Sequence, residues 1–113
     1  MTFAFGYASA APSRGAIDAL SGPVLLEFGT DWCGFCLASA PIVIKAVAAH
    51  PSVKHLKVED GHGRALGRSF QVKLWPTLVF LAGGKEVARL VRPTEGNALV
   101  QALTAIDPMG SAQ

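Results

Sequence analysis

Trp32-Cys33-Gly34-Phe35-Cys36 holds both cysteines of this 113-residue chain, at a point where a strand is predicted to give way to a helix. Residues 24–28 form a short apolar run typical of a buried strand, and residues 37–49 favour a helix. Cysteines at i and i+3 in a first helical turn bring their Cα atoms within the roughly 4.4–6.8 Å that a disulfide spans. The free N–H groups and the positive dipole end of a helix N-terminus favour thiolate over thiol. The segment therefore predicts a dithiol that can cycle with a disulfide.

Length and composition favour one domain, residues 1–113, with a single core. Hydrophobic residues make up 50% of the chain and charged residues 16%, which excludes disorder and suits a buried sheet. The net charge of +2 is too small and too scattered for a nucleic-acid or polybasic membrane surface. No apolar run approaches the length of a membrane helix. We therefore expect neither a nucleic-acid partner nor a membrane partner.

The N-terminal residues 1–11 are mildly apolar and contain Ala8-Ser9-Ala10, which superficially matches a cleavage site. No Lys or Arg precedes Arg14, and the apolar stretch is too short for the core of a signal peptide. Two cysteines do not make the framework of a disulfide-dependent secreted protein. We expect a cytoplasmic protein, with a periplasmic location as the alternative if a leader has been removed.

Predicted strands alternate with predicted helices and end in a hairpin and a last helix. Pro41 lies inside a predicted helix, where it removes one backbone hydrogen bond and is expected to kink the helix. Gly83-Gly84 is expected to turn between the last two strands. The order indicates an α/β sandwich with a mixed sheet. The expected strands are 2–7 (an edge strand), 24–29, 52–59, 77–81 and 85–91, and the expected helices are 13–20, 37–49, 63–70 and 96–106. The apolar side of helix 37–49 is expected to carry Leu37, Ile42, Val43, Ile44 and Val47.

The chain resembles the thioredoxin family in four features that occur in order and at suitable spacing. They are Phe28 with the Trp32–Cys36 segment, the helix proline Pro41, the segment Trp75-Pro76-Thr77 and the hairpin Gly83-Gly84. A lone C-x-x-C also serves zinc sites, but here a Pro-Thr pair follows about 40 residues later at the head of a strand. The resemblance extends from about residue 3 to residue 106. It implies a thioredoxin-like fold, with a central mixed β-sheet flanked by helices on both faces.

The resemblance also implies a thiol–disulfide oxidoreductase that reduces protein disulfides. Cys33, at the exposed start of the helix, is expected to be the nucleophile, and Cys36, more buried, the resolving thiol. No cofactor is expected beyond this redox-active pair. The chain has no G-x-G-x-x-G fingerprint and is too short to add a flavin or nicotinamide domain, so a separate reductase would recycle it. A monomer is expected.

Glu27 is the third expected catalytic residue. Relatives carry a buried carboxylate at this point that is thought to relay a proton for the resolving cysteine, and burial is expected to raise its pKa. The alternative places Glu27 at a strand end facing solvent. Lys57 would pair with Glu27 across neighbouring strands in one register, but a shift of one residue reverses the face.

Several residues are expected to contact substrate. The resemblance implies a cis peptide bond before Pro76, a proline that packs beside the two thiols. Trp75 would offer backbone groups to an extended substrate peptide, and its side chain either forms an aromatic wall or packs partly buried. Trp32 and the dipeptide Gly34-Phe35 would belong to the contact surface. Arg92 either adds charge at the lip of the substrate groove or, as we favour, is solvated.

Three departures from the family pattern limit the resemblance. Phe35 replaces the proline found in the most reducing relatives. We therefore assume neither a reduction potential near about −270 mV nor one near about −120 mV for the cysteine pair. Phe35 brings no charge or hydrogen bond to the thiolate, so we expect nothing as oxidising as the extreme members. Gly29 stands where an aromatic residue commonly supports the active-site loop, which predicts a looser loop. Trp75 replaces a smaller residue. Together they indicate a protein with its own client.

Alternatives remain for both the site and the function. A zinc site would need two of His50, His55 and His62 beside the cysteines, but we expect all three histidines on the solvated surface. The protein would act as an oxidant or isomerase if it served exported proteins. It would be a non-catalytic binding or redox-sensing module if the dithiol were not used.

Overall fold

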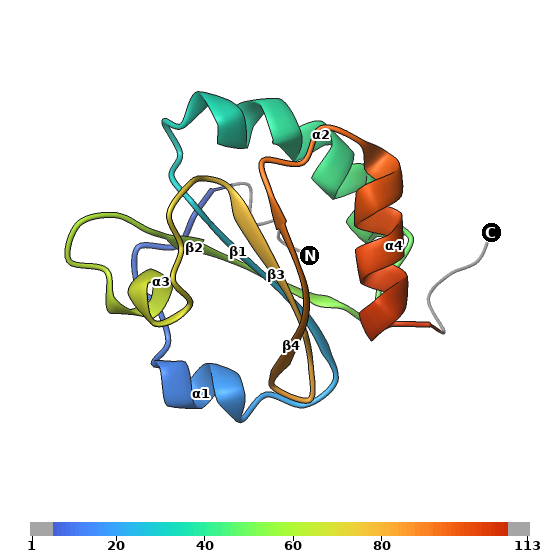
Figure 1. Ribbon diagram of the computed structural model, residues 1–113, viewed down its shortest axis with the longest axis horizontal. Helices are drawn as coiled ribbons and strands as arrows, with labels where there is room; N and C mark the ends of the chain where they lie inside the picture. Colours follow the sequence, from blue (N-terminus) through green and yellow to red (C-terminus); the bar gives the residue numbers. More distant parts are fainter. Residues whose placement is uncertain (1–5, 109–113) are drawn as a thin grey trace.

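The computed structural model describes residues 6–108, and its helices and strands alternate as the sequence predicts (Figure 1). The expected edge strand falls mainly on residues outside this range. Next to it, Ala8 forms an isolated parallel bridge with Val58. The elements are α1 (Arg14–Asp18), β1 (Pro23–Gly29), α2 (Gly34–Ala48), β2 (Lys54–Glu59), α3 (Ala65–Ser69), β3 (Thr77–Ala82), β4 (Lys85–Val91) and α4 (Gly96–Ile106).

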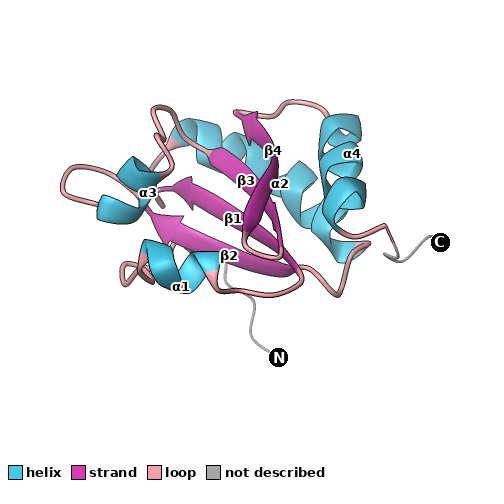
Figure 2. Ribbon diagram, turned by 60° about the horizontal axis from the view of Figure 1, so that its bottom comes forward, coloured by secondary structure: helices cyan, strands magenta, loops and turns pink. Residues whose placement is uncertain are grey.

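The four strands form one mixed sheet in the order β2-β1-β3-β4. Strand β1 pairs in parallel with β2 and antiparallel with β3, which pairs antiparallel with β4. Helices α2 and α4 cover one face and α1 and α3 the other (Figures 1 and 2). This is the thioredoxin-like arrangement that the sequence indicates.

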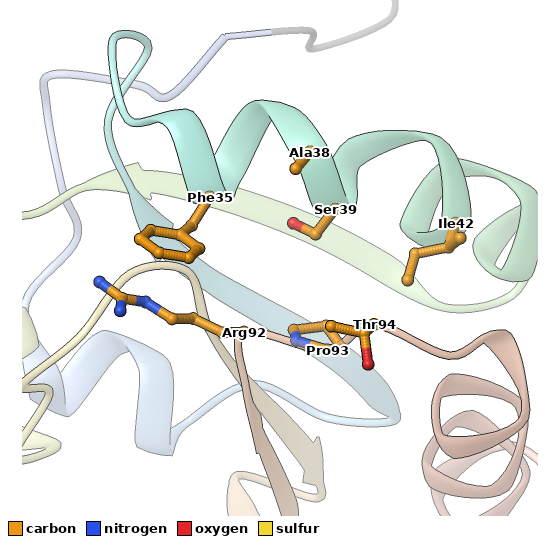
Figure 3. A pocket seen from close by; sticks show the side chains of 7 residues that line it. All are labelled: Phe35, Ala38, Ser39, Ile42, Arg92, Pro93 and Thr94. Atoms are coloured by element: carbon orange, nitrogen blue, oxygen red, sulfur yellow. The ribbon is translucent and has the colours of Figure 1, made fainter.

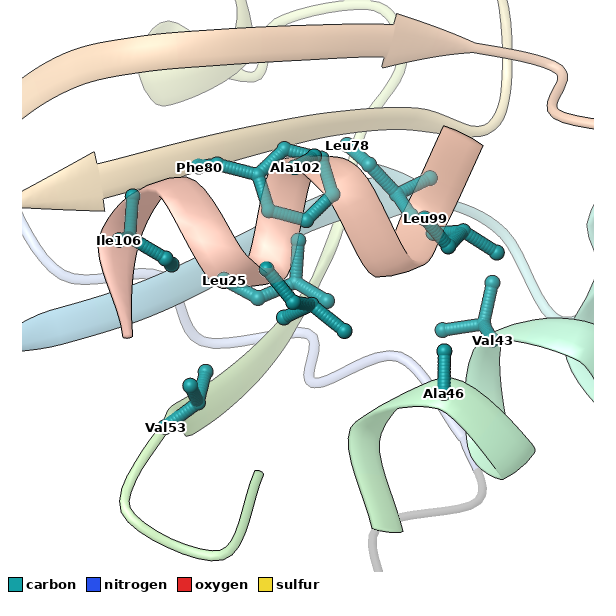
Figure 4. Close-up of a cluster of buried hydrophobic side chains, with 10 residues drawn as sticks. Leu25, Val43, Ala46, Val53, Leu78, Phe80, Leu99, Ala102 and Ile106 are labelled. Atoms are coloured by element: carbon teal, nitrogen blue, oxygen red, sulfur yellow. The ribbon is translucent and has the colours of Figure 1, made fainter. Parts of the chain in front are cut away.

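Strand β1 lies at the centre of the sheet, and residues 24–29 are all buried. Successive side chains of a strand point to opposite faces. Leu25 therefore packs under α2 and α4 (Figure 4), whereas Leu26 and Phe28 pack toward α1 and α3. Glu27 follows Leu25 by two residues, so it shares the face under α2. The alternation of β1 thus places a carboxylate in an otherwise apolar layer.

Helix α2 begins at Gly34, three residues earlier than expected, and continues on both sides of Pro41. Leu37 and Ile44 were expected on its apolar side, but they are 63% and 54% exposed. The buried side chains of α2 are mostly smaller than the leucine and isoleucine that the apolar pattern favours. The buried positions of α2 are Cys36, Ser39, Val43 and Ala46. The kink at Pro41 stays a prediction.

The hairpin between β3 and β4 turns at Gly83-Gly84, as expected. Gly84 has φ +79°, and a Cβ there would lie 2.0 Å from the Asp18 carbonyl oxygen. Only glycine therefore lets this turn pack against the end of α1. Within the described residues, the helices are too short or too polar to span a bilayer.

Candidate active site

The two cysteines occupy the first turn of α2, both as free thiols. Cys33 is the N-cap of the helix, and its Sγ accepts a hydrogen bond from the Cys36 backbone N–H at 3.3 Å. Cys33 was expected to be exposed, yet it is 7% exposed against 3% for Cys36. The reason is the neighbouring loop, whose Trp75 carbonyl oxygen lies 3.9 Å from the Cys33 Sγ.

The surroundings of the two thiols push their pKa values in opposite directions. Burial raises the pKa of Cys33, but hydrogen bonds from Cys36 and the Phe35 N–H, with the charge of Arg92, bring it below its ordinary value. Burial and the hydrogen bond with Cys33 raise the pKa of Cys36 to about 11. At neutral pH Cys33 is therefore the better nucleophile, and Cys36 keeps its proton until a base removes it.

The loop before β3 presents a cis peptide bond between Trp75 and Pro76, as the resemblance implies. The half-buried Trp75 is held by a 2.9 Å hydrogen bond from its Nε1–H to Asp60 Oδ2. Its ring meets Trp32 edge-on, with 5.8 Å between ring centroids. Trp32 itself is 73% exposed. The two indoles thus form an aromatic surface beside Cys33.

Arg92 was expected to be solvated, but its side chain is half-buried against the site. The guanidinium lies 3.7 Å above the centroid of the Phe35 ring, and Nε–H donates a 2.8 Å hydrogen bond to the Trp75 carbonyl. These two contacts hold the guanidinium between the Phe35 ring and the Trp75 carbonyl, where its charge acts on Cys33. Phe35 carries no charge, but its ring holds the positively charged Arg92 side chain close enough to act on Cys33.

A shallow pocket of about 210 Å³ continues from this contact between α2 and the segment that follows β4 (Figure 3). Phe35, Ser39 and Ile42 line it on the helix side, and Arg92 with its two successors lines it on the other side. The pocket is largely apolar apart from the guanidinium and two hydroxyls.

Glu27 is buried, with 2% of its surface exposed, so the alternative that places it in solvent is wrong. Its Oε1 accepts a 2.7 Å hydrogen bond from His55 Nε2, and its Oε2 accepts one from the Tyr7 hydroxyl. Burial raises the pKa of Glu27, but these two bonds and the charges of His55 and Lys57 outweigh it and lower the pKa. The expectation of a raised pKa is therefore wrong. The register sets Lys57 directly opposite Glu27, and Lys57 contributes through its charge.

Two residues of this carboxylate site escaped the sequence reasoning. His55 lies two residues before Lys57 on β2, so the register that places Lys57 near Glu27 also puts His55 on that face. Nothing in the sequence around Tyr7 predicts its place in the site. The one related feature is Gly29, whose missing side chain leaves room for the Tyr7 ring, because a Cβ there would lie 2.6 Å from Cys36 Sγ and 2.7 Å from Tyr7 Cζ. Tyr7 thus places an aromatic ring directly beside Gly29.

The histidines are not all solvated as expected. His62 is exposed, but His55 is half-buried beside Glu27, and His50 is buried with its Nδ1 2.9 Å from Asp107 Oδ2. His50 and His55 each pair with a carboxylate that is distant in the sequence, so the local pattern does not predict their burial. Within residues 6–108, no three His, Cys, Asp or Glu side chains are grouped to hold a metal ion.

A reactive thiol at a helix N-terminus, a protonated partner one turn along and a cis-proline beside them define a dithiol–disulfide redox protein. The family model for thioredoxin matches residues 13–105. A thioredoxin of Chlamydia trachomatis is 32% identical over 84 residues, which are 74% of this chain and 82% of that protein. The reduced thioredoxin 2 of Pseudomonas aeruginosa is 53% identical, with a TM-score of 0.84 over 96% of this chain and 100% of that chain. Fasciola hepatica thioredoxin is 28% identical, with a TM-score of 0.65 over 76% of this chain and 82% of that one. The chain belongs to the thioredoxin family, and it is a thiol–disulfide oxidoreductase of the protein-disulfide reductase class.

Proposed function

We propose that Cys33 opens the disulfides of client proteins and that Cys36 resolves the mixed disulfide that forms. Cys33 thiolate attacks one client sulfur, and the other client sulfur leaves as a thiolate. Cys36 then attacks Cys33, the Cys33–Cys36 disulfide forms, and the client leaves as a dithiol. Two electrons pass to the client, and Glu27 accepts the proton that Cys36 must lose. A separate reductase returns two electrons to the pair.

The observation that carries these roles is the opposite pKa shift of two neighbouring thiols. The pKa of Cys33 is lowered and that of Cys36 is raised to about 11. A pair used only as a structural disulfide needs no such difference, whereas a nucleophile and a later resolving thiol do.

The client is proposed to lie across the two indoles and the start of α2. Trp32, Gly34 and Phe35 are exposed, and the half-buried Trp75, next to the buried Pro76, forms the facing wall. The Arg92 guanidinium stands between the wall and the pocket beside Phe35. A peptide with an apolar residue and a nearby carboxylate suits this surface, because it meets indole faces and one cation.

We further propose that the protein acts as a single-domain monomer in the cytoplasm, where a reducing environment maintains the thiols. The first test is the reduction potential of the Cys33–Cys36 pair, by equilibration in glutathione buffers and trapping of free thiols. A value near about −270 mV supports a disulfide reductase, and one near about −180 mV or higher supports an oxidant or isomerase. Failure to form a disulfide in any buffer overturns the proposal in favour of a binding module. Alkylation near pH 7 is expected to label Cys33 much faster than Cys36, and equal slow labelling would contradict the assigned roles.

A further inference from the structure

The side chain of Tyr7 reaches from the N-terminal segment into the space beside Gly29, between α2 and the sheet. Its hydroxyl donates a hydrogen bond to Glu27 Oε2 and also interacts with the Cys36 thiol. A Cβ placed on Gly29 would lie 2.6 Å from Cys36 Sγ and 2.8 Å from the Tyr7 hydroxyl oxygen, so the thiol and the phenol border the same small space. The phenol therefore contacts both the thiol that must lose a proton and the buried carboxylate of Glu27.

Hydrogen bonds hold the backbone around Tyr7 against its neighbours. The Tyr7 N–H donates to Asp31 Oδ1 at 2.8 Å. One residue on, the Ala8 N–H donates to the Lys57 carbonyl and the Ala8 carbonyl accepts from the Glu59 N–H, both at 2.9 Å. The Lys57 Nζ also lies 4.5 Å from the centroid of the Tyr7 ring. Contacts with β2 and with the active-site loop thus hold the phenol in place.

We propose that the Tyr7 hydroxyl conducts the proton of Cys36 to Glu27 when Cys36 attacks the mixed disulfide. The Cys36 proton moves to the phenol oxygen while the phenol proton moves to Glu27 Oε2, so Tyr7 ends unchanged. The Cys36 sulfur, now a thiolate, bonds to Cys33 and expels the second client thiolate. When a reductase later opens the Cys33–Cys36 disulfide, Cys36 leaves as a thiolate and takes a proton back by the same path. This inference rests on the roles proposed above for the two cysteines.

His55 is a positioning residue in this arrangement. Its Nε2–H donates to Glu27 Oε1 at 2.7 Å, which leaves Oε2 facing the phenol. Glu27 is ionised at neutral pH and can therefore accept the proton. The transfer from Cys36 to this weak base is uphill, and it is drawn forward by the Cys33–Cys36 bond that the Cys36 thiolate forms. The lowered pKa of Glu27 then favours release of the proton to solvent. The half-buried edge of the site, where His55 is 20% exposed, lies next to the carboxylate. Among residues 6–108, five titratable or charged groups surround the phenol and the Cys36 thiol. They are Glu27 on β1, His55 and Lys57 on β2, Cys33 at the N-cap of α2 and Asp31 in the loop between β1 and α2.

The test is the stopped-flow reaction of the reduced protein with the aromatic disulfide DTNB. One coloured thiolate is released when Cys33 attacks and a second when Cys36 closes the disulfide, so the two steps appear as separate phases. In Tyr7→Phe, which keeps the ring and removes the hydroxyl, we expect an unchanged first phase. We expect a second phase slowed about tenfold or more, the effect of losing a hydrogen bond to a group that becomes charged. The pH profile of the second phase is expected to move to higher pH.

Two further variants separate proton conduction from a loss of structure. His55→Leu, which removes the donor to Glu27, is expected to slow the second phase, and His55→Gln is expected to restore much of the rate. Ser69→Ala removes a hydroxyl hydrogen-bonded to the Leu66 carbonyl, remote from the thiols, and both phases should match the parent. If Tyr7→Phe and the parent close the disulfide equally fast at every pH, the role of Tyr7 is overturned. If the parent itself shows no second phase, the proposed roles of the cysteines fail instead.

Discussion

Arg92 directly follows β4 and places a cation near the dithiol. Its charge is one of the causes that lower the pKa of Cys33, and Phe35 and the Trp75 carbonyl hold it in place. We expect Arg92→Gln to raise the pKa of Cys33 and to slow its alkylation near neutral pH about two- to fivefold. This range corresponds to the interaction of up to about 1 kcal/mol of a partly exposed charge. Arg92→Lys keeps the charge and is expected to react nearly as the parent does. Equal rates in the parent and Arg92→Gln would show that the charge does not act on Cys33.

Gly29 leaves no room for a side chain between Cys36 and Tyr7. A Cβ there would lie 2.6 Å from Cys36 Sγ and 2.7 Å from Tyr7 Cζ. We expect Gly29→Ala to lower the free energy of unfolding by about 1–3 kcal/mol, the usual effect of overpacking, in urea denaturation. Gly96→Ala is the matched control, because a Cβ at that helical position meets nothing within 4 Å. The control is expected to be neutral or to stabilise by up to about 1 kcal/mol. A neutral Gly29→Ala would mean that the Tyr7 ring yields easily, and the site would be looser than the structure shows.

At the level of helices and strands, local pattern predicts well wherever one short segment contains the cause. The apolar run of β1, the hairpin glycines and the dithiol at the start of α2 all fall in this class. The cis-proline came from the resemblance and is present. The contacts of Tyr7 with Glu27 and of His55 with Glu27 join residues 20 and 28 positions apart, so no local pattern reports them. Leu37 and Ile44 were misplaced because small buried residues, rather than large apolar ones, define the packed face of α2.

Helices α2 and α4 are tied together just beyond their C-terminal ends by a buried pair. His50 Nδ1 lies 2.9 Å from Asp107 Oδ2, and both side chains are less than 10% exposed. We expect Asp107→Ala to destabilise the protein by about 1–3 kcal/mol, because it leaves a buried imidazole without its partner. Asp18→Ala breaks the exposed pair with Arg14 and is expected to cost about 0.5 kcal/mol or less. Urea midpoints of the two variants measure the difference. Similar losses would mean that solvent reaches His50.

For the molecule as a whole, the buried carboxylate of Glu27 couples stability to pH. Its pKa is lowered on folding, because hydrogen bonds from His55 and Tyr7 outweigh burial. As the pH falls below the usual range of a glutamate, the unfolded chain takes up this proton before the folded protein does. Stability contributed by Glu27 is therefore present above about pH 4.5 and is lost as the pH falls toward the folded pKa.

The measurement is the free energy of unfolding from urea titrations between neutral and acid pH, for the parent and for Glu27→Gln. We expect the parent to lose its advantage over the variant as the pH falls, because glutamine does not titrate. Glu86→Gln removes an exposed carboxylate paired with Arg89, and its difference from the parent is expected to change only slightly with pH. A parent that gains stability over Glu27→Gln on acidification would show a raised pKa for Glu27. The carboxylate would then hold a proton in the resting protein, and Tyr7 would face a neutral acid in place of the ionised acceptor that proton transfer from Cys36 requires.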